Sequence, residues 1–257
     1  MWRHIAQSLQ GPSHLADGTA CQDSNVVHLL GDGPTGTLVA CVADGAGSAK
    51  FSDTGATIAC NTVLENATAH YDANSGQFDN LNREDILRWC DDARTRIKSE
   101  ASIRECNCRE FASTLCVVIA APDCSVFFQI GDGAIIVRNH GIYGVVFWPQ
   151  SGEYANSTNF LTADDYQDRL DFLTTTSRCS NVALFTDGLE RLALRFDNQT
   201  PHGPFFDPLF RALRSAGDLD GLNVGLRQFL ASDSVQVRSD DDKTLILATR
   251  HDSDDAA

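Results

Sequence analysis

The amino-acid sequence predicts an α+β protein built in layers. Short apolar or β-branched runs bounded by turn residues recur along the chain, as they do in strands. Two long helical patterns follow one another between the early and the later strands, and no internal repeat or low-complexity linker divides the 257 residues. Alternating βα units would intersperse the two kinds of element. We therefore expect one layered domain over residues 1–250, followed by an acidic tail over residues 251–257.

The predicted strands are short, and turn residues separate them. A strand is expected just after Gln22-Asp23, and the linkers "GDG" and "NHG" later in the chain contain the glycines typical of hairpins. We therefore expect an antiparallel meander from residue 113 to residue 147. The remaining predicted strands cover residues 37–44, 113–121, 125–130, 134–138, 141–147, 182–186 and 244–249.

Two long helices are predicted between the early strands and this meander. Over residues 52–70, Ile58, Val63 and Leu64 recur on one side, with alanines between them. The second pattern covers residues 82–103 and carries apolar residues at helical spacing. Shorter helices are expected over residues 208–216 and 219–231.

Composition and charge exclude several classes of function. Hydrophobic residues make up 42% of the chain and charged residues 21%, as in globular proteins. The net charge of −15 argues against nucleic acid or an anionic membrane as a partner. No apolar stretch approaches the roughly 20 residues of a membrane helix, and the first ten residues lack a signal-peptide pattern. We expect a cytoplasmic protein whose nine scattered cysteines stay reduced, without a zinc or redox site.

An acidic residue stands at the end of a predicted buried element in five places, and in three of them a glycine follows. One Asp-Gly pair after a strand is an ordinary turn. Several carboxylates that converge at buried strand ends, however, need a compensating cation. Oxygen ligands without His or Cys favour magnesium or manganese over zinc. The acidic positions are Asp23, Asp44, Asp132, Asp187 and the pair Asp241-Asp242.

The ordered set of motifs at these positions resembles the metal-dependent protein serine/threonine phosphatases of the type-2C (PPM) family, in particular their compact bacterial branch. The motifs are "CQDS", "VADGAGS", "IGDGA", "FTDGL" and "DDKT", and the resemblance spans about residues 12–249. It implies a four-layer α-β-β-α sandwich of two antiparallel sheets flanked by helix pairs. It also implies a variable flap at about residues 148–179, beside the active site.

The resemblance assigns roles to individual residues. Asp44 falls where the family has its metal-bridging aspartate, and Gly45 where a backbone carbonyl contributes to one metal. Asp187 and Asp241 fall on the acids that hold the other metal. Asp23 falls on an acid that supports metal-bound water, directly or through another group. Catalysis is thus expected to depend on Asp44, Asp241 and Asp23.

The resemblance also implies the cofactors and the reaction. Two Mn²⁺ or Mg²⁺ ions would be bound tightly, and Asp132 falls on an acid linked with a third, more weakly held ion. Two such ions acidify a shared water and neutralise phosphate charge during in-line attack. From the residues themselves, Asp132 has an alternative role, in which its carboxylate merely caps the turn. The implied partners are a phosphorylated protein substrate and an opposing Ser/Thr kinase.

Three positions depart from the pattern of the family. Gln22 stands where many relatives carry Glu, Gly18 where a phosphate-binding Arg is common, and Ala46 where many carry a His near the leaving group. His14 and Lys50 are the candidates to supply the missing phosphate contact, and a surface role is the alternative for each.

Two other functions compete with a phosphatase. A pseudophosphatase or metal-dependent binding module would keep the fold with little turnover, and the three departures favour it. Retention of Asp44, Asp187 and Asp241 favours an enzyme. A two-metal nuclease is disfavoured by the net charge of −15, because nucleic acid repels an acidic surface.

Overall fold

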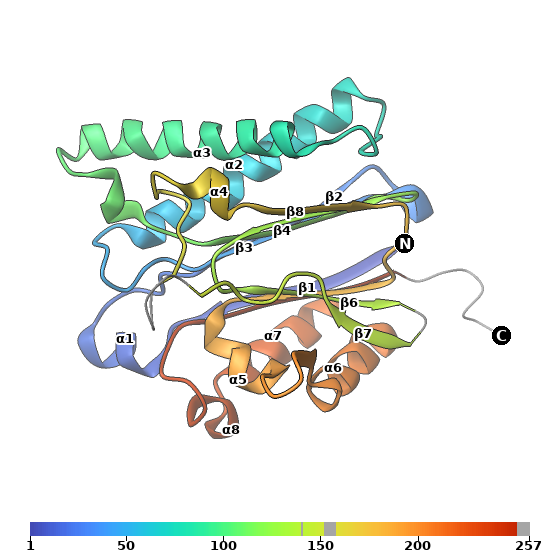
Figure 1. Cartoon of the computed structure of the whole chain (residues 1–257). Helices are drawn as coiled ribbons and strands as arrows, with labels where there is room; N and C mark the ends of the chain where they lie inside the picture. The colour runs from blue at the N-terminus through green and yellow to red at the C-terminus, as the bar shows by residue number, and fades with distance from the viewer. Residues whose placement is uncertain (140, 152–157, 251–257) are drawn as a thin grey trace.

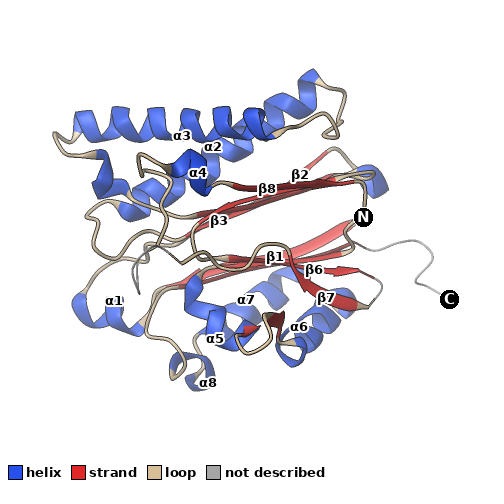
Figure 2. Cartoon of the chain, viewed as in Figure 1, coloured by secondary structure: helices blue, strands red, loops and turns tan. Residues whose placement is uncertain are grey.

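Two five-stranded antiparallel sheets pack face to face, and helices cover both outer faces (Figures 1 and 2). This arrangement, seen in a computed structural model that describes residues 1–139, 141–151 and 158–250, confirms the predicted α+β sandwich. The predicted tail over residues 251–257 lies outside the described residues. In the described part of the chain, no helix combines the length and the apolar character needed to span a membrane.

The first sheet has the strand order β2-β3-β4-β5-β8, and every neighbouring pair is antiparallel. Its inner strands are buried on both faces, which explains why they read as continuous apolar runs rather than alternating ones. Its strands are β2 (Ser24–Leu30), β3 (Thr37–Ala43), β4 (Leu115–Ala120), β5 (Ser125–Ile130) and β8 (Asp171–Thr175).

The second sheet has the order β1-β12-β9-β6-β7, also antiparallel throughout. The chain thus places its first and last strands side by side. The sequence does not predict the first of them, because polar residues interrupt its apolar ones and only Trp2 and Ile5 are buried. The strands are β1 (Trp2–Leu9), β12 (Lys243–Arg250), β9 (Asn181–Phe185), β6 (Ala134–Asn139) and β7 (Ile142–Val145), and a separate small ribbon pairs β10 (Leu194–Arg195) with β11 (Thr200–Pro201).

Helices α2 and α3 cover the first sheet, and α6 and α7 cover the second (Figure 1). A capping box at Asn82 and Asp85 begins α3 where the sequence predicts it. Helix α6 begins at Gly203 rather than at the predicted Pro208, because Phe205 and Phe206 bury their rings there and add a turn. The helices are α1 (Pro12–Asp17), α2 (Ser52–Ala73), α3 (Arg83–Ile103), α4 (Tyr166–Arg169), α5 (Glu190–Ala193), α6 (Gly203–Ser215), α7 (Leu219–Leu230) and α8 (Asp233–Gln236).

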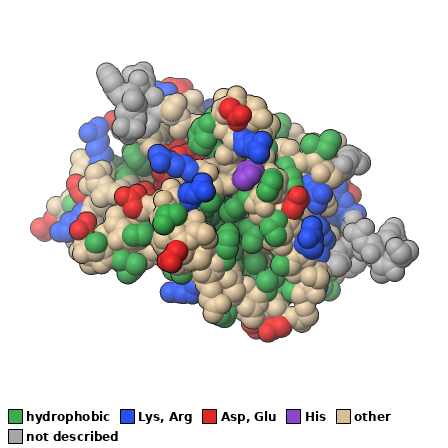
Figure 3. Space-filling view, turned by 90° about the horizontal axis from the view of Figure 1, so that it is seen from below, with side chains coloured by type: hydrophobic (Ala, Val, Ile, Leu, Met, Phe, Trp, Pro, Cys, Tyr) green, Lys and Arg blue, Asp and Glu red, His purple; other side chains and the backbone are tan. Residues whose placement is uncertain are grey.

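Three apolar layers hold the sandwich together. One fills the space between α2, α3 and the first sheet, one lies between the two sheets, and one joins the second sheet to α6 and α7. On the outer face that α5 to α8 form, acidic and basic side chains are interspersed around an apolar area (Figure 3). The surplus negative charge is therefore not concentrated on this face.

The predicted meander from residue 113 to residue 147 is wrong at its centre. β4 and β5 form one hairpin and β6 and β7 another, but β5 and β6 belong to different sheets. The "GDG" linker carries the chain from one sheet to the other. Gly131 has φ 106°, and a Cβ there would lie 2.5 Å from the Thr114 side chain, so both glycine freedom and glycine size are needed. Hairpins and sheet crossings both use such glycines, so the sequence does not separate them.

The described part of residues 148–179 includes both α4 and β8, while residues 152–157 lie outside the described residues. β8 pairs with β5 and extends the first sheet. Arg94 of α3 anchors the segment before α4, since its guanidinium donates to the carbonyls of Leu161 and Ala163 and lies 4.3 Å from the Tyr166 ring centroid.

Candidate active site

Strand register brings three of the predicted acids to one end of the first sheet. Ala43 pairs with Ser24, so Asp44 and Asp23, one residue beyond them, lie at the same end. Ile130, the last residue of β5, pairs with the first residue of β4. Asp132 comes two residues after Ile130 and so lies at this end of the sheet as well. The acids are far apart in sequence, and antiparallel pairing brings them together.

The second sheet delivers its acids to the same edge of the sandwich. Phe185 pairs with both Ala134 and Leu245, so the end of β9, the start of β6 and the start of β12 are level with one another. Asp187 follows the end of β9, Asp132 precedes the start of β6, and Asp241 precedes the start of β12. Asp132 thus belongs to the ends of both sheets, because it lies in the crossing between them.

A cavity of about 510 Å³ opens at this edge, and its walls are acidic. Four of the predicted residues, Asp44, Asp132, Asp187 and Asp241, line it together with Gly45. Asp240 also lines it, although we had not singled it out from the sequence. The other lining residues are Ser13, His14, Ala46, Gly47, Ser48, Thr158 and Phe160.

The loop that carries Asp44 is tied to β4 through the backbone. The Asp44 N–H donates to the Thr114 hydroxyl at 2.9 Å, and the Thr114 N–H donates to the Asp44 carbonyl at 2.8 Å. A Cβ at Gly45 would lie 2.7 Å from the Gln22 carbonyl oxygen and from backbone of Ser52. Only glycine can come this close to both segments, so Gly45 lets the loop pack against the residue before Asp23 and the start of α2.

The carboxylates raise one another's pKa values. Burial raises the pKa of Asp44 well above its ordinary value, and the charges of Asp23, Asp187, Asp132 and Asp241 raise it further. Burial and then the charges of Asp132 and Asp241 raise the pKa of Asp187 to about 7.

The oxygens in this cavity fit a hard divalent cation. Asp132 Oδ1 and Asp187 Oδ1 are buried and have no hydrogen-bond partner in residues 1–139, 141–151 and 158–250, which is costly for a carboxylate unless another ligand binds it. The candidate ligands are all oxygens, as magnesium and manganese prefer. Among the described residues, no three His, Cys, Asp or Glu side chains already converge tightly enough to enclose an ion.

Asp23 faces the protein interior rather than lining the cavity. Its Oδ2 accepts hydrogen bonds from the hydroxyls of Thr186 (2.7 Å) and Thr244 (2.8 Å). Burial, partly offset by these two bonds, raises the pKa of Asp23 to about 8. Thr186 directly precedes Asp187, and Thr244 lies just after the "DD" pair. Asp23 therefore ties together the two strand ends that carry Asp187 and Asp241.

Asp242 is a second inward-facing carboxylate. It belongs to the predicted acidic pair Asp241-Asp242, and the sequence indicates no role for it. Its side chain is 2% exposed, and it accepts from the Gly11 N–H (2.7 Å) and the Gln22 N–H (2.5 Å). Nδ1 of His14 lies 2.9 Å from its Oδ1. The distance is that of an ion pair, although the ring N–H is not aligned for a hydrogen bond. Gln22 is buried beside it.

Lys50 does not reach the acidic cavity. It is exposed, its ammonium lies 5.1 Å from the centroid of the Phe51 ring, and its backbone N–H donates to Glu110. Of the two candidates for a phosphate contact, the structure brings only His14 to the cavity.

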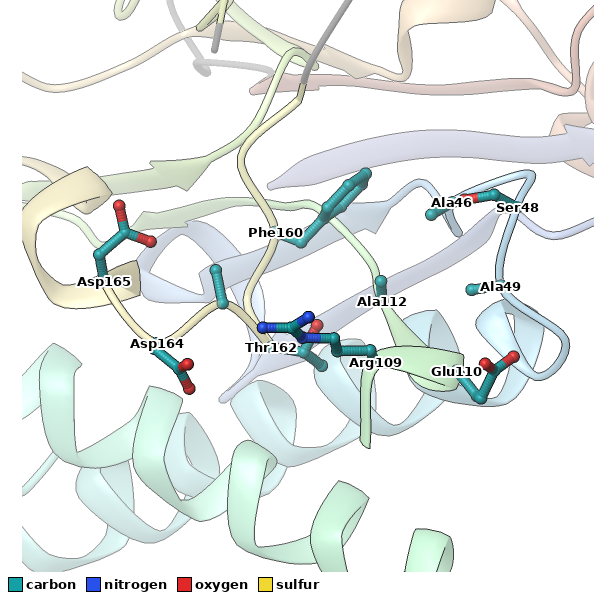
Figure 4. A pocket seen from close by; sticks show the side chains of 11 residues that line it. Ala46, Ser48, Ala49, Arg109, Glu110, Ala112, Phe160, Thr162, Asp164 and Asp165 are labelled. Atoms are coloured by element: carbon teal, nitrogen blue, oxygen red, sulfur yellow. The ribbon is translucent and has the colours of Figure 1, made fainter. Parts of the chain in front are cut away.

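A second cavity of about 560 Å³ adjoins the acidic one. Ala46, Ser48 and Phe160 line both. In Figure 4, the Arg109 side chain extends below Phe160 toward Thr162, while Glu110 lies on the opposite side. This second cavity was not predicted, because most of its walls come from the segment before β4 and the segment before α4, which carry no recognisable motif.

Known proteins resemble this chain along most of its length. Residues 10–231 match the family model described as protein phosphatase 2C. The chain is 39% identical over 253 residues to serine/threonine-protein phosphatase 3 of Escherichia coli (strain K12), a match that covers 96% of this chain and 98% of that protein.

Solved structures share the fold at lower identity. PppA, described as a key regulatory component of T6SS in Pseudomonas aeruginosa, is 18% identical, with a TM-score of 0.63 and coverage of 97% of this chain and 98% of that one. The catalytic domain of the serine threonine protein phosphatase PstP, solved in complex with two manganese ions, is 15% identical, with a TM-score of 0.61 and coverage of 98% and 99%. At these identities, the likeness shows the fold.

Proposed function

The chain belongs to the protein phosphatase 2C family, and we propose that it hydrolyses phosphoserine and phosphothreonine in proteins at the acidic cavity. One observation supports this site above all. Acids from both sheets line a single cavity, and buried oxygens of Asp132 and Asp187 have no hydrogen-bond partner among the described residues. Such a set of oxygens is suited to divalent cations, and two-cation sites are a common means of cleaving phosphate esters.

Asp44, Asp187 and Asp241 would hold two Mn²⁺ or Mg²⁺ ions, with the Gly45 carbonyl as a further ligand. Asp132 would hold a third ion more weakly, since Thr158 already donates to its Oδ2 at 2.6 Å. The bound ions supply neutralisation of phosphate charge and an acidified water. Asp23 would support the site without binding an ion, because its hydrogen bonds to Thr186 and Thr244 hold two ligand-bearing strand ends in register.

The neighbouring cavity is suited to the polypeptide around the phosphorylated residue. It is continuous with the acidic cavity at Ala46, Ser48 and Phe160. Residues 148–179 would act as the flap that shapes access, with Thr158 bonded to Asp132 at its base and Phe160 between the cavities. The substrates would be phosphorylated proteins, and a Ser/Thr kinase would supply them.

The test is turnover of a phosphothreonine peptide and an aryl phosphate with manganese, with magnesium and with excess chelator. We expect manganese to support hydrolysis of both substrates and chelator to abolish it. Undiminished hydrolysis in excess chelator would contradict a reaction that depends on divalent cations.

A pseudophosphatase is the second candidate. The observation that favours it is the cavity wall, where Ala46 replaces a larger polar group and no Lys or Arg is found among the described lining residues. A phosphopeptide that binds in the presence of manganese, but is not cleaved, would support this function instead.

A further inference from the structure

His14 is the only side chain capable of positive charge among the described residues that line the acidic cavity. The others are carboxylates, small residues, hydroxyls and Phe160. Hydrolysis of a phosphoserine or phosphothreonine releases an alkoxide, which is a poor leaving group until it receives a proton. The chain needs a group that can deliver that proton inside the cavity.

The fold holds His14 against the segment that supplies the cavity acids. The backbone N–H and the hydroxyl of Ser13 both donate to the Asp240 carbonyl, at 3.0 Å and 2.7 Å. A Cβ at Gly11 would lie 2.3 Å from the backbone of Asp241, so the start of α1 is in direct contact with this segment. The backbone on either side of His14 is therefore held against Asp240 and Asp241.

The Asp242 carboxylate lies at ion-pair distance from the His14 imidazole. Asp242 is 2% exposed, two backbone N–H groups hold its carboxylate in place, and its Oδ1 lies 2.9 Å from His14 Nδ1. The His14 side chain is 15% exposed. With Nδ1 facing a fixed carboxylate, Nε2 is the ring nitrogen available to a ligand in the cavity. A histidine held in this way by a buried aspartate is a common arrangement for proton transfer.

We propose that His14 is the general acid that protonates the seryl or threonyl oxygen, and that Asp242 is its positioning residue. This assignment rests on the proposed phosphatase function. Water forms the new P–O bond, and the P–O bond to the side-chain oxygen breaks with its electron pair left on that oxygen. The imidazolium of His14 gives its Nε2 proton to this oxygen and becomes neutral. The attacking water brings two protons. One of them returns to His14, and the other stays on the phosphate, so the products are the free alcohol and hydrogen phosphate.

The leaving group distinguishes this role from phosphate binding. p-Nitrophenolate departs without a proton at neutral pH, whereas a threonyl alkoxide does not. We expect His14→Gln to lower kcat on a phosphothreonine peptide by roughly 10²-fold, within the usual range for general acid catalysis. The same variant should change kcat on p-nitrophenyl phosphate by less than about threefold, because no proton is transferred to that leaving group. His28→Gln, an exposed position on β2, is the matched control and should alter neither.

Asp242→Asn provides a second variant should His14→Gln fold poorly. It should show the same selectivity with a smaller loss, and the melting temperature of both variants is measured to normalise turnover to folded protein. An equal loss on both substrates would overturn the acid role in favour of phosphate binding. Unchanged kcat on the phosphopeptide would overturn it as well. Wild-type protein that cleaves neither substrate with saturating manganese would contradict the proposed function itself, together with the acid role.

Discussion

Two groups of carboxylates meet at one edge of the sandwich, and the protein partners them differently. In the cavity, Asp132 and Asp187 each have a buried oxygen that accepts no hydrogen bond from any residue the structure describes. Behind it, Asp23 accepts from two threonine hydroxyls, and Asp242 accepts from two backbone N–H groups and faces His14. Both groups lie at strand ends and look alike in sequence.

Hydrogen-bond partners distinguish the candidate metal ligands from the supporting carboxylates, whereas the direction of the pKa shift does not. The pKa is raised to about 7 for Asp187 and to about 8 for Asp23, mainly by burial in both cases. Within the described part of the chain, one oxygen of Asp187 has no hydrogen-bond partner, which leaves it available to a cation. Asp23 has its partners within the protein, so we expect it to support the fold around the site. Substitutions in the two groups should therefore have opposite effects.

The largest effect is expected from Asp44→Asn. This change should reduce phosphatase turnover by roughly 10³-fold, because it removes a carboxylate that no neighbour can replace. It should leave the melting temperature in chelator unchanged or slightly raised, because repulsion from Asp187 and Asp132 is relieved. Asp241→Asn should behave similarly in turnover. Asp72→Asn, an exposed change on α2, is the control. Near-normal turnover of either cavity variant with saturating manganese would remove that residue from the ligand set.

Asp242→Ala should have the opposite sign in stability. It leaves the N–H groups of Gly11 and Gln22 buried without an acceptor, a loss of about 3 kcal/mol for a buried carboxylate that accepts several bonds. Denaturant unfolding in chelator measures this loss directly. A melting temperature equal to that of the wild-type protein would show that Asp242 belongs with the cavity group instead.

The metal-free protein should be more stable at about pH 6 than at about pH 8.5. The pKa values of Asp187 and Asp23 rise from 3.8 to about 7 and about 8, so the folded protein binds more protons than the unfolded chain in this window. The free energy of unfolding therefore falls as pH rises through it, by roughly 3 kcal/mol. Melting in chelator at several pH values measures the slope. Saturating manganese should flatten the slope, and a slope of the opposite sign would contradict these shifts.

The smallest effect is expected from Asp132→Ala. Tight metal binding should persist while turnover on phosphopeptides falls by roughly tenfold, because only the weaker third ion loses a carboxylate. If Asp132 merely holds Thr158 at the sheet crossing, the variant should lose stability at an unchanged rate per folded molecule. Calorimetric metal counting combined with turnover separates the two outcomes.

Much of this molecule could be predicted from local sequence. β5 begins and ends where its apolar run does, and α3 begins at the capping residue Asn82. Four of the predicted ligand acids, Asp44, Asp132, Asp187 and Asp241, line one cavity. These features follow from side-chain periodicity, capping and turn chemistry, which act over a few residues.

Tertiary structure alone decided the rest. Whether "GDG" turns back within a sheet or crosses to the other depends on which strands the neighbouring runs pair with, and local propensity does not specify long-range pairing. The same holds for the direction of each acid. Asp241 and Asp242 are adjacent, yet one lines the cavity and the other faces His14, because successive side chains next to a strand point to opposite sides. Local sequence is enough to predict that the acids lie at strand ends. Packing between segments remote in sequence decided which of them remain free to bind a cation.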